Sequence, residues 1–155
     1  MIKNYIIIIT MIFSNSILFG QTSLDLDYFK TLSLNISDLN DYMLTFNFEF
    51  HDTSSNEIGK NYIWSINRNK SNAEYFYALY INNDGSKSIS FQSLMKSDYV
   101  SFKSTIKSKG LIFKEIEDVD GLLVEKFSNS NYECSIWTGV ANDLTTYEMN
   151  LKKVR

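Results

Sequence analysis

Polar and apolar positions along the chain change period several times, and each change predicts a new element. Helical spacing comes first, because residues 24–34 have the pattern of a short, weak helix. A firmer helix is predicted to begin at Ser37, a residue type that caps helices, with Asp38 at its positive end. Its apolar side chains follow the i, i+3, i+4, i+7 rule and are Leu39, Tyr42, Met43 and Phe46.

Strict alternation then replaces the helical spacing and predicts a half-buried strand over residues 46–50. Its phenylalanines face the core and its polar residues face solvent, with Glu49 and His51 on the polar side. Further strands are predicted at 62–66, 74–81 and 88–91. The string at 82–85, Asn-Asn-Asp-Gly, is typical of a tight turn between the last two of these strands.

A similar order of elements then follows. A helix is predicted with Ser97 and Asp98 as its cap and Gly110 as its stop. Strands are predicted at 111–116, 122–127, 132–138 and 145–151, with turns at 118–121 and 128–131 and a loop at 139–143.

This order predicts an α+β protein made of two helix-plus-four-strand units, with possible half-repeats at residues 24–95 and 96–155. The units are expected to form a two-layer sandwich with the helices on one face of an antiparallel sheet. Residue identity between the halves is slight, so the duplication is inferred from element order only.

The first twenty residues have the order of a secretory signal peptide: Lys3, an apolar run at 5–13, and Gly20 before the expected cut. The apolar run is half of what a membrane span needs, which favours cleavage over a retained anchor. We therefore expect a periplasmic or secreted protein whose mature chain is one domain over residues 21–155.

Composition narrows the possible partners. Net charge is −3, and loss of Lys3 leaves 14 basic against 18 acidic residues, or −4. Nucleic acid and anionic membrane both require clustered basic residues, so the sequence predicts neither. The hydrophobic fraction of 44% is sufficient for a core. Cys134 is the one cysteine, cannot form an internal disulfide, and is predicted to be buried.

Aromatic residues in the strands are the candidates for binding. The strand at 74–81 is apolar or aromatic on both faces. Either it is a central strand covered on both sides, or it presents an aromatic face to a partner, as Tyr and Trp often do in protein interfaces. In the second case the binding residues are Trp64, Tyr75 and Tyr77, and the partner is another envelope or extracellular protein.

The sequence contains no phosphate-binding loop, nucleophile elbow or paired metal ligands, and predicts no cofactor and no metal site. The best acid–base pair is Glu49 with His51, two residues apart on one strand, although an ordinary solvated strand face has the same pattern. The acidic stretch ending in Asp120-Gly121 is too short to hold calcium unaided and is typical of a tight turn.

Five segments together resemble a group of small exported bacterial proteins of unknown function: residues 24–27, the helix that begins at Ser37, the strand at 46–50, the helix at 99–110 and the last strand at 147–151. The element order is also similar to that of β-lactamase inhibitor proteins, which pair two helix-and-four-strand units. These resemblances imply an exported α+β domain and transfer no binding residue. The predicted function is a non-catalytic binding or interaction protein of the bacterial cell envelope. The alternatives are a small hydrolase using His51 and Glu49, or a small-ligand carrier.

Overall fold

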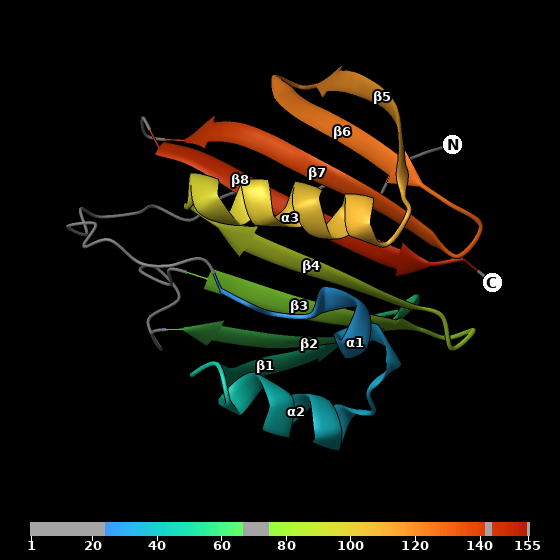
Figure 1. Cartoon of the computed structure of the whole chain (residues 1–155). Helices are drawn as coiled ribbons and strands as arrows, with labels where there is room; N and C mark the ends of the chain where they lie inside the picture. Colours follow the sequence, from blue (N-terminus) through green and yellow to red (C-terminus); the bar gives the residue numbers. More distant parts are fainter. Residues whose placement is uncertain (1–23, 67–74, 142–143, 155) are drawn as a thin grey trace.

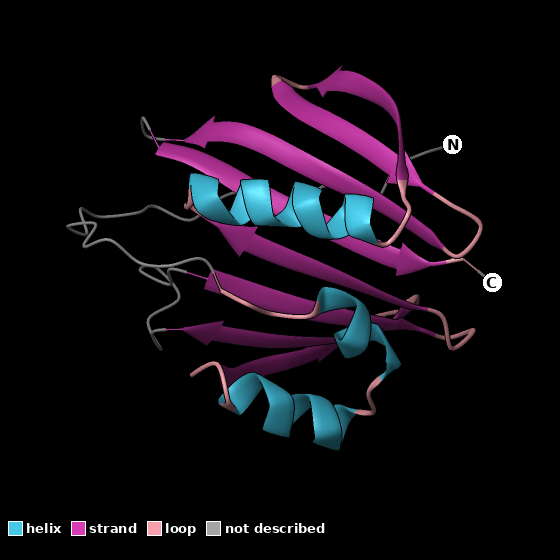
Figure 2. Cartoon of the chain, viewed as in Figure 1, coloured by secondary structure: helices cyan, strands magenta, loops and turns pink. Residues whose placement is uncertain are grey.

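Eight antiparallel strands form one open sheet with three helices in the computed structural model, which describes residues 24–66, 75–141 and 144–154 (Figures 1 and 2). The predicted α+β class is confirmed. The predicted signal peptide lies outside the described residues. Strand order is β1-β2-β3-β4-β8-β7-β6-β5. The strands are β1 (Glu49–Ser55), β2 (Gly59–Ile66), β3 (Tyr75–Asn82), β4 (Lys87–Ser93), β5 (Ile112–Val119), β6 (Leu122–Ser128), β7 (Tyr132–Ala141) and β8 (Leu144–Lys153).

The helices are α1 (Tyr28–Ser33), α2 (Ile36–Leu44) and α3 (Lys96–Ser108). Helix α3 lies along the middle of the sheet and contacts β8, whereas α1 contacts β4 and β8 and α2 contacts β1 (Figure 1). Phe91 of β4 is the centre of the resulting core. Its ring lies 5.3 Å from that of Tyr28 in α1 and 5.4 Å from that of Phe102 in α3. All three side chains are buried, so both helices are joined to the central strands by aromatic packing.

The helix starts differ from those predicted. Asn35, not Ser37, caps α2, because its Oδ1 accepts a hydrogen bond from the Asp38 backbone N–H at 2.9 Å. Helix α3 begins after Met95, which has no capping side chain. Asp98 is buried within its first turn and accepts a hydrogen bond from Ser93. The predicted stop at Gly110 is confirmed by its left-handed φ of 74°.

The first strand begins later than alternation predicts. Phe46 belongs to the turn that ends α2, and Asn47 takes a left-handed φ of 62° there. The Phe48 backbone N–H then donates to the Met43 carbonyl at 3.1 Å, so this segment completes the helix end instead of starting the strand. Phe50 was predicted to face the core, yet it is 48% exposed on the sheet edge.

Two other predictions concern the second half of the sheet. The loop predicted at 139–143 is wrong in part, since β7 continues to Ala141 and β8 begins at Leu144. Cys134 is buried as predicted, and burial raises the pKa of its thiol to about 12. At neutral pH this thiol is protonated, so it is not the activated thiolate that a nucleophile needs.

Candidate functional site

The three aromatic residues predicted to bind a partner face the helices instead. Trp64, Tyr75 and Tyr77 are 0%, 3% and 0% exposed. Trp64 donates its indole N–H to Asn40 of α2 at 3.1 Å. The expectation that these side chains lie on an open sheet face is therefore wrong, because strand alternation directs them into the helix-covered core.

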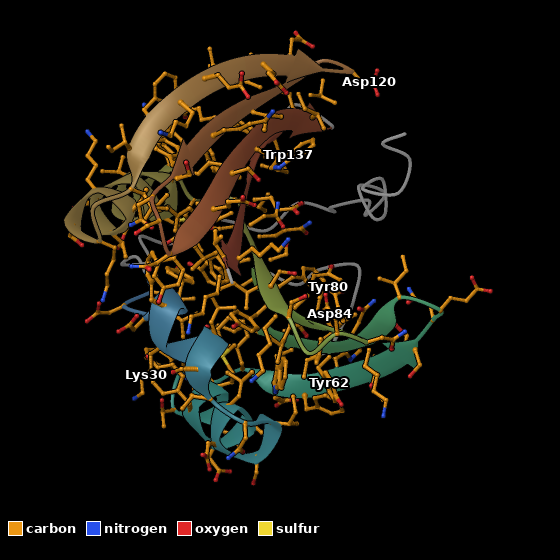
Figure 3. All side chains as sticks on the ribbon, turned by 90° about the vertical axis from the view of Figure 1, so that its right-hand side faces the viewer. Lys30, Tyr62, Tyr80, Asp84, Asp120 and Trp137 are labelled. Atoms are coloured by element: carbon orange, nitrogen blue, oxygen red, sulfur yellow. The ribbon has the colours of Figure 1, made fainter. Side chains whose placement is uncertain are left out.

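The opposite face of the sheet consists of the residues that alternate with these aromatics. Figure 3 shows Tyr80 and Trp137 of this face on the side away from α1 and α3. We call this surface the open face. One row of register neighbours across it is Ser65, Phe76, Gln92, Glu148, Trp137 and Val124. The adjacent row is Ile63, Ala78, Ser90, Asn150, Ser135 and Lys126.

Glu148 lies in the middle of the open face, on central strand β8. Its carboxylate accepts hydrogen bonds from Ser90 Oγ at 3.0 Å, Gln92 Nε2 at 2.8 Å and Asn150 Nδ2 at 3.0 Å. All three donors are neutral, and within the described ranges no Lys or Arg forms an ion pair with Glu148. The network therefore holds the carboxylate in place, and among the described residues no cation compensates its negative charge.

Two aromatic side chains, Trp137 and Phe76, lie in the same row of the open face as this carboxylate. Trp137 is the direct register partner of Glu148, and its indole N–H donates to Ser135 Oγ at 2.9 Å, which fixes the ring. Phe76 is the register partner of Gln92 on the other side. Tyr80 of β3 lies on the same face, and burial and then the negative charge of Glu148 raise the pKa of its phenol. These side chains are partly exposed, so they are accessible yet held on rigid strands.

The open face is acidic. Strand register and alternation assign six acidic and two basic residues of the described strands to it. The acids are Glu49, Asp52, Glu115, Glu117, Glu133 and Glu148, and the bases are Lys126 and Lys152. Lys126 already contacts Glu117 at 2.6 Å and Glu115 at 3.0 Å. Such a surface attracts positively charged partners.

The predicted acid–base pair occupies a second location, at the β1 edge of the sheet. A shallow hollow there is lined by Leu44, Glu49, Phe50, His51 and Ser65. A bulge between Phe50 and Asp52 removes His51 from the pairing with β2. Nε2 of His51 is buried without a hydrogen-bond partner in the described part of the chain. Glu49 and His51 thus do line one hollow, but neither Glu49 nor Ser65 is hydrogen-bonded to that nitrogen.

The acidic stretch runs along β5 and ends in a turn at Asp120 and Gly121, within the predicted turn at 118–121. Asp118 Oδ1 accepts from the Gly121 backbone N–H at 2.9 Å, and both Asp120 and Gly121 have positive φ, of 54° and 82°. Among the described residues, no group of three or more His, Cys, Asp or Glu is placed to hold a metal ion. Within the same residues, no helix has the length and apolar character needed to cross a membrane.

Glu148, Trp137 and Tyr80 were not predicted as site residues. A usable signal was present in β8, where Glu148 and Asn150 alternate with Tyr147, Met149 and Leu151. Polar residues inside a long strand indicate which of its faces the helices leave uncovered. Carrying that alternation across the register of β4 and β7 identifies the open face.

No protein-family model, curated protein or solved structure matches this chain. No activity is therefore transferred from another protein, and the function must be argued from the two sites just described.

Proposed function

We propose that the protein is a non-catalytic binding protein of the bacterial cell envelope, exported through its first twenty residues, and that its open face binds another envelope or extracellular protein. The observation that carries the proposal is the set of partly exposed aromatic side chains around Glu148. The export step rests on the basic and apolar pattern of residues 1–20.

The chemistry of the open face is that of an interface centre. Tyr and Trp provide large contact areas at low entropic cost and are enriched among the residues that dominate binding energy. Trp137 and Tyr80 lie on β7 and β3, each of which is paired on both sides within the sheet. Strand pairing and the Ser135 hydrogen bond hold Trp137 ready for contact, so binding requires little ordering.

We further propose that the chain consists of two helix-plus-four-strand units with all helices on one sheet face. The element order supports this, since α2 precedes β1–β4 and α3 precedes β5–β8. On this arrangement one face of the sheet is used for stability and the other is left for a partner.

The proposal is tested by capturing a partner from envelope extract with immobilised protein. Wild type, Trp137→Ala and Val100→Ala are compared, because Val100 is 57% exposed on α3 and lies off the open face. We expect the partner to be captured by wild type and Val100→Ala and lost with Trp137→Ala. Equal capture by all three proteins would rule out the open face.

A second candidate function is a small hydrolase. It is favoured by the hollow in which His51, with its unpartnered Nε2, lies beside Glu49 and Ser65. A nitrophenyl ester assay with wild type, His51→Ala and Val100→Ala tests it. Turnover that is lost only with His51→Ala would favour the enzyme, whereas partner capture that is unaffected by His51→Ala agrees with the binding protein.

The small-ligand carrier has less support. A carrier pocket was expected between the helices and the sheet, but aromatic rings pack there. The hollow described above lies instead at the sheet edge.

A further inference from the structure

The geometry points to the chemistry of the partner: we propose that it presents an arginine side chain, which lies against Trp137 and pairs with Glu148. This inference rests on the proposed function and adds the kind of side chain that the open face recognises. The juxtaposition that carries it is an uncompensated, hydrogen-bonded carboxylate beside a fixed indole ring.

The charge of Glu148 requires a cation from any protein that covers the open face. A carboxylate has about four acceptor positions, and Glu148 uses three of them on neutral donors. A protein that covered this face without supplying a cation would strip water from an unpaired charge, which strongly disfavours binding. A cation from the partner removes that penalty and completes the hydrogen bonding of the carboxylate.

The indole ring beside Glu148 favours arginine over lysine. Trp137 lies next to Glu148 on the neighbouring strand, with its ring held by Ser135. A guanidinium is planar, stacks on aromatic faces and donates several hydrogen bonds in a fixed fork. A lysine ammonium is a more strongly hydrated point charge, so it gains less from the same ring and carboxylate.

The extent of the acidic surface indicates a protein partner rather than a small cation. The described strands place six acids and two lysines on the open face. Glu115 and Glu117 pair with Lys126, and Glu49 and Asp52 also have partners, so the excess of acids over bases lies in the face as a whole. An extended acidic surface complements an extended basic one, and that complementarity speeds encounter and orients the two proteins. Glu148 then provides the specific contact within a broader attraction.

Titration of the full chain with hexa-arginine and hexa-lysine peptides at physiological salt tests the inference, with tryptophan emission as the readout. Trp64 is fully buried, so a change in emission on binding reports on Trp137. We expect Glu148→Gln to weaken hexa-arginine binding about tenfold or more, the scale of a lost charged hydrogen bond. Glu133→Gln removes the same charge from an exposed position on the same face and should change affinity less than about twofold.

Several outcomes would overturn the inference. They are no peptide binding to wild type, equal affinity for the two peptides, or equal weakening by Glu148→Gln and Glu133→Gln, which indicates diffuse charge alone. Thermal melts check that each variant is folded. If Glu148→Gln is not folded, the inference is tested on wild type alone, by comparing the blue shift or quench of tryptophan emission that hexa-arginine and hexa-lysine produce. A dimer that Trp137→Ala dissociates would place a second copy on the face and also overturn it.

Failure of this inference is distinct from failure of the proposed function. If the envelope partner is lost with Trp137→Ala but kept with Glu148→Gln, the open face binds its partner without an arginine at Glu148. If neither change affects capture, the open face is not the binding surface.

Discussion

The two faces of the sheet come from the same eight strands but carry different chemistry. On the helix-covered face Trp64, Tyr77 and Phe91 are neighbours across three strands, and each is 0% exposed. On the open face the equivalent neighbours Ser65, Phe76 and Gln92 mix hydroxyl, aromatic and amide groups. The contrast is not complete, because the Tyr77 hydroxyl is buried with no hydrogen-bond partner among the described residues, and Ser65 on the open face is 1% exposed. Burial under helices nevertheless favours apolar side chains, whereas partly exposed positions such as Phe76 and Gln92 accept aromatic or polar ones. The open face can therefore carry a partner site without loss of stability.

The largest expected effect is on the helix-covered face. Phe102 of α3 is fully buried between the rings of Tyr28 and Phe91. We expect Phe102→Ala to lower the free energy of unfolding by about 3–5 kcal/mol, measured by urea denaturation. Val100→Ala on the exposed side of the same helix should change it by less than about 0.5 kcal/mol. A loss below about 1 kcal/mol for Phe102→Ala would mean that α3 is packed on a different face.

Each face of the sheet carries one tryptophan, so replacing each in turn compares how much the two faces contribute to stability. Trp64 is fully buried and hydrogen-bonded to Asn40, whereas Trp137 is partly exposed. We expect Trp64→Ala to destabilise the protein by about 2 kcal/mol more than Trp137→Ala, because only the first leaves a core cavity. Urea denaturation of both variants measures this difference. Equal losses would show that Trp137 is a core residue, not a surface available for binding.

Asp98 is a polar side chain buried inside the core. Burial raises the pKa of the Asp98 carboxyl, although the Ser93 hydroxyl donates to it and opposes the rise. A raised folded-state pKa favours the protonated form, so its stabilising contribution is present below the unfolded pKa of about 4 and is lost as pH rises through the folded pKa. We expect Asp98→Asn, which stays neutral, to gain stability relative to wild type between pH 4 and 7. A constant difference across that range would contradict this.

The smallest expected effect is at the border of the core. Lys103 of α3 contacts Glu125 of β6 at 2.7 Å and the Tyr99 hydroxyl at 3.0 Å. The pair is partly solvated, so Lys103→Met should cost no more than about 1 kcal/mol in unfolding free energy. Lys107→Met, at an exposed position of the same helix, is the matched control. If the loss exceeds 2 kcal/mol at high salt, the contact is a core interaction and not a surface ion pair.

Most of the strands were predictable because alternation and turn residues are local signals. Asn82 to Gly85 marked the β3–β4 turn, and Gly85 there has a φ of 80°. The correct face of β3 was not predictable from β3 alone, since Tyr75, Tyr77 and Leu79 alternate with Phe76, Ala78 and Tyr80, and both sets are mainly apolar. Which set faces the helices depends on contacts with α1 and α2, far away in sequence.

The bulge at His51 illustrates a second limit. Alternation placed Glu49 and His51 on one side of a regular strand, but a bulge is set by how β1 pairs with β2. The resulting hollow therefore could not be predicted, although both of its titratable residues were. Register is a property of two strands together, and a single strand's pattern does not contain it.

The central claim is that the open face binds and the helix-covered face stabilises. Partner capture and unfolding free energy, measured together on Trp137→Ala, test it most directly. We predict that this variant folds with a stability within about 2 kcal/mol of wild type and captures no partner. Capture at the wild-type level by folded Trp137→Ala would contradict the account.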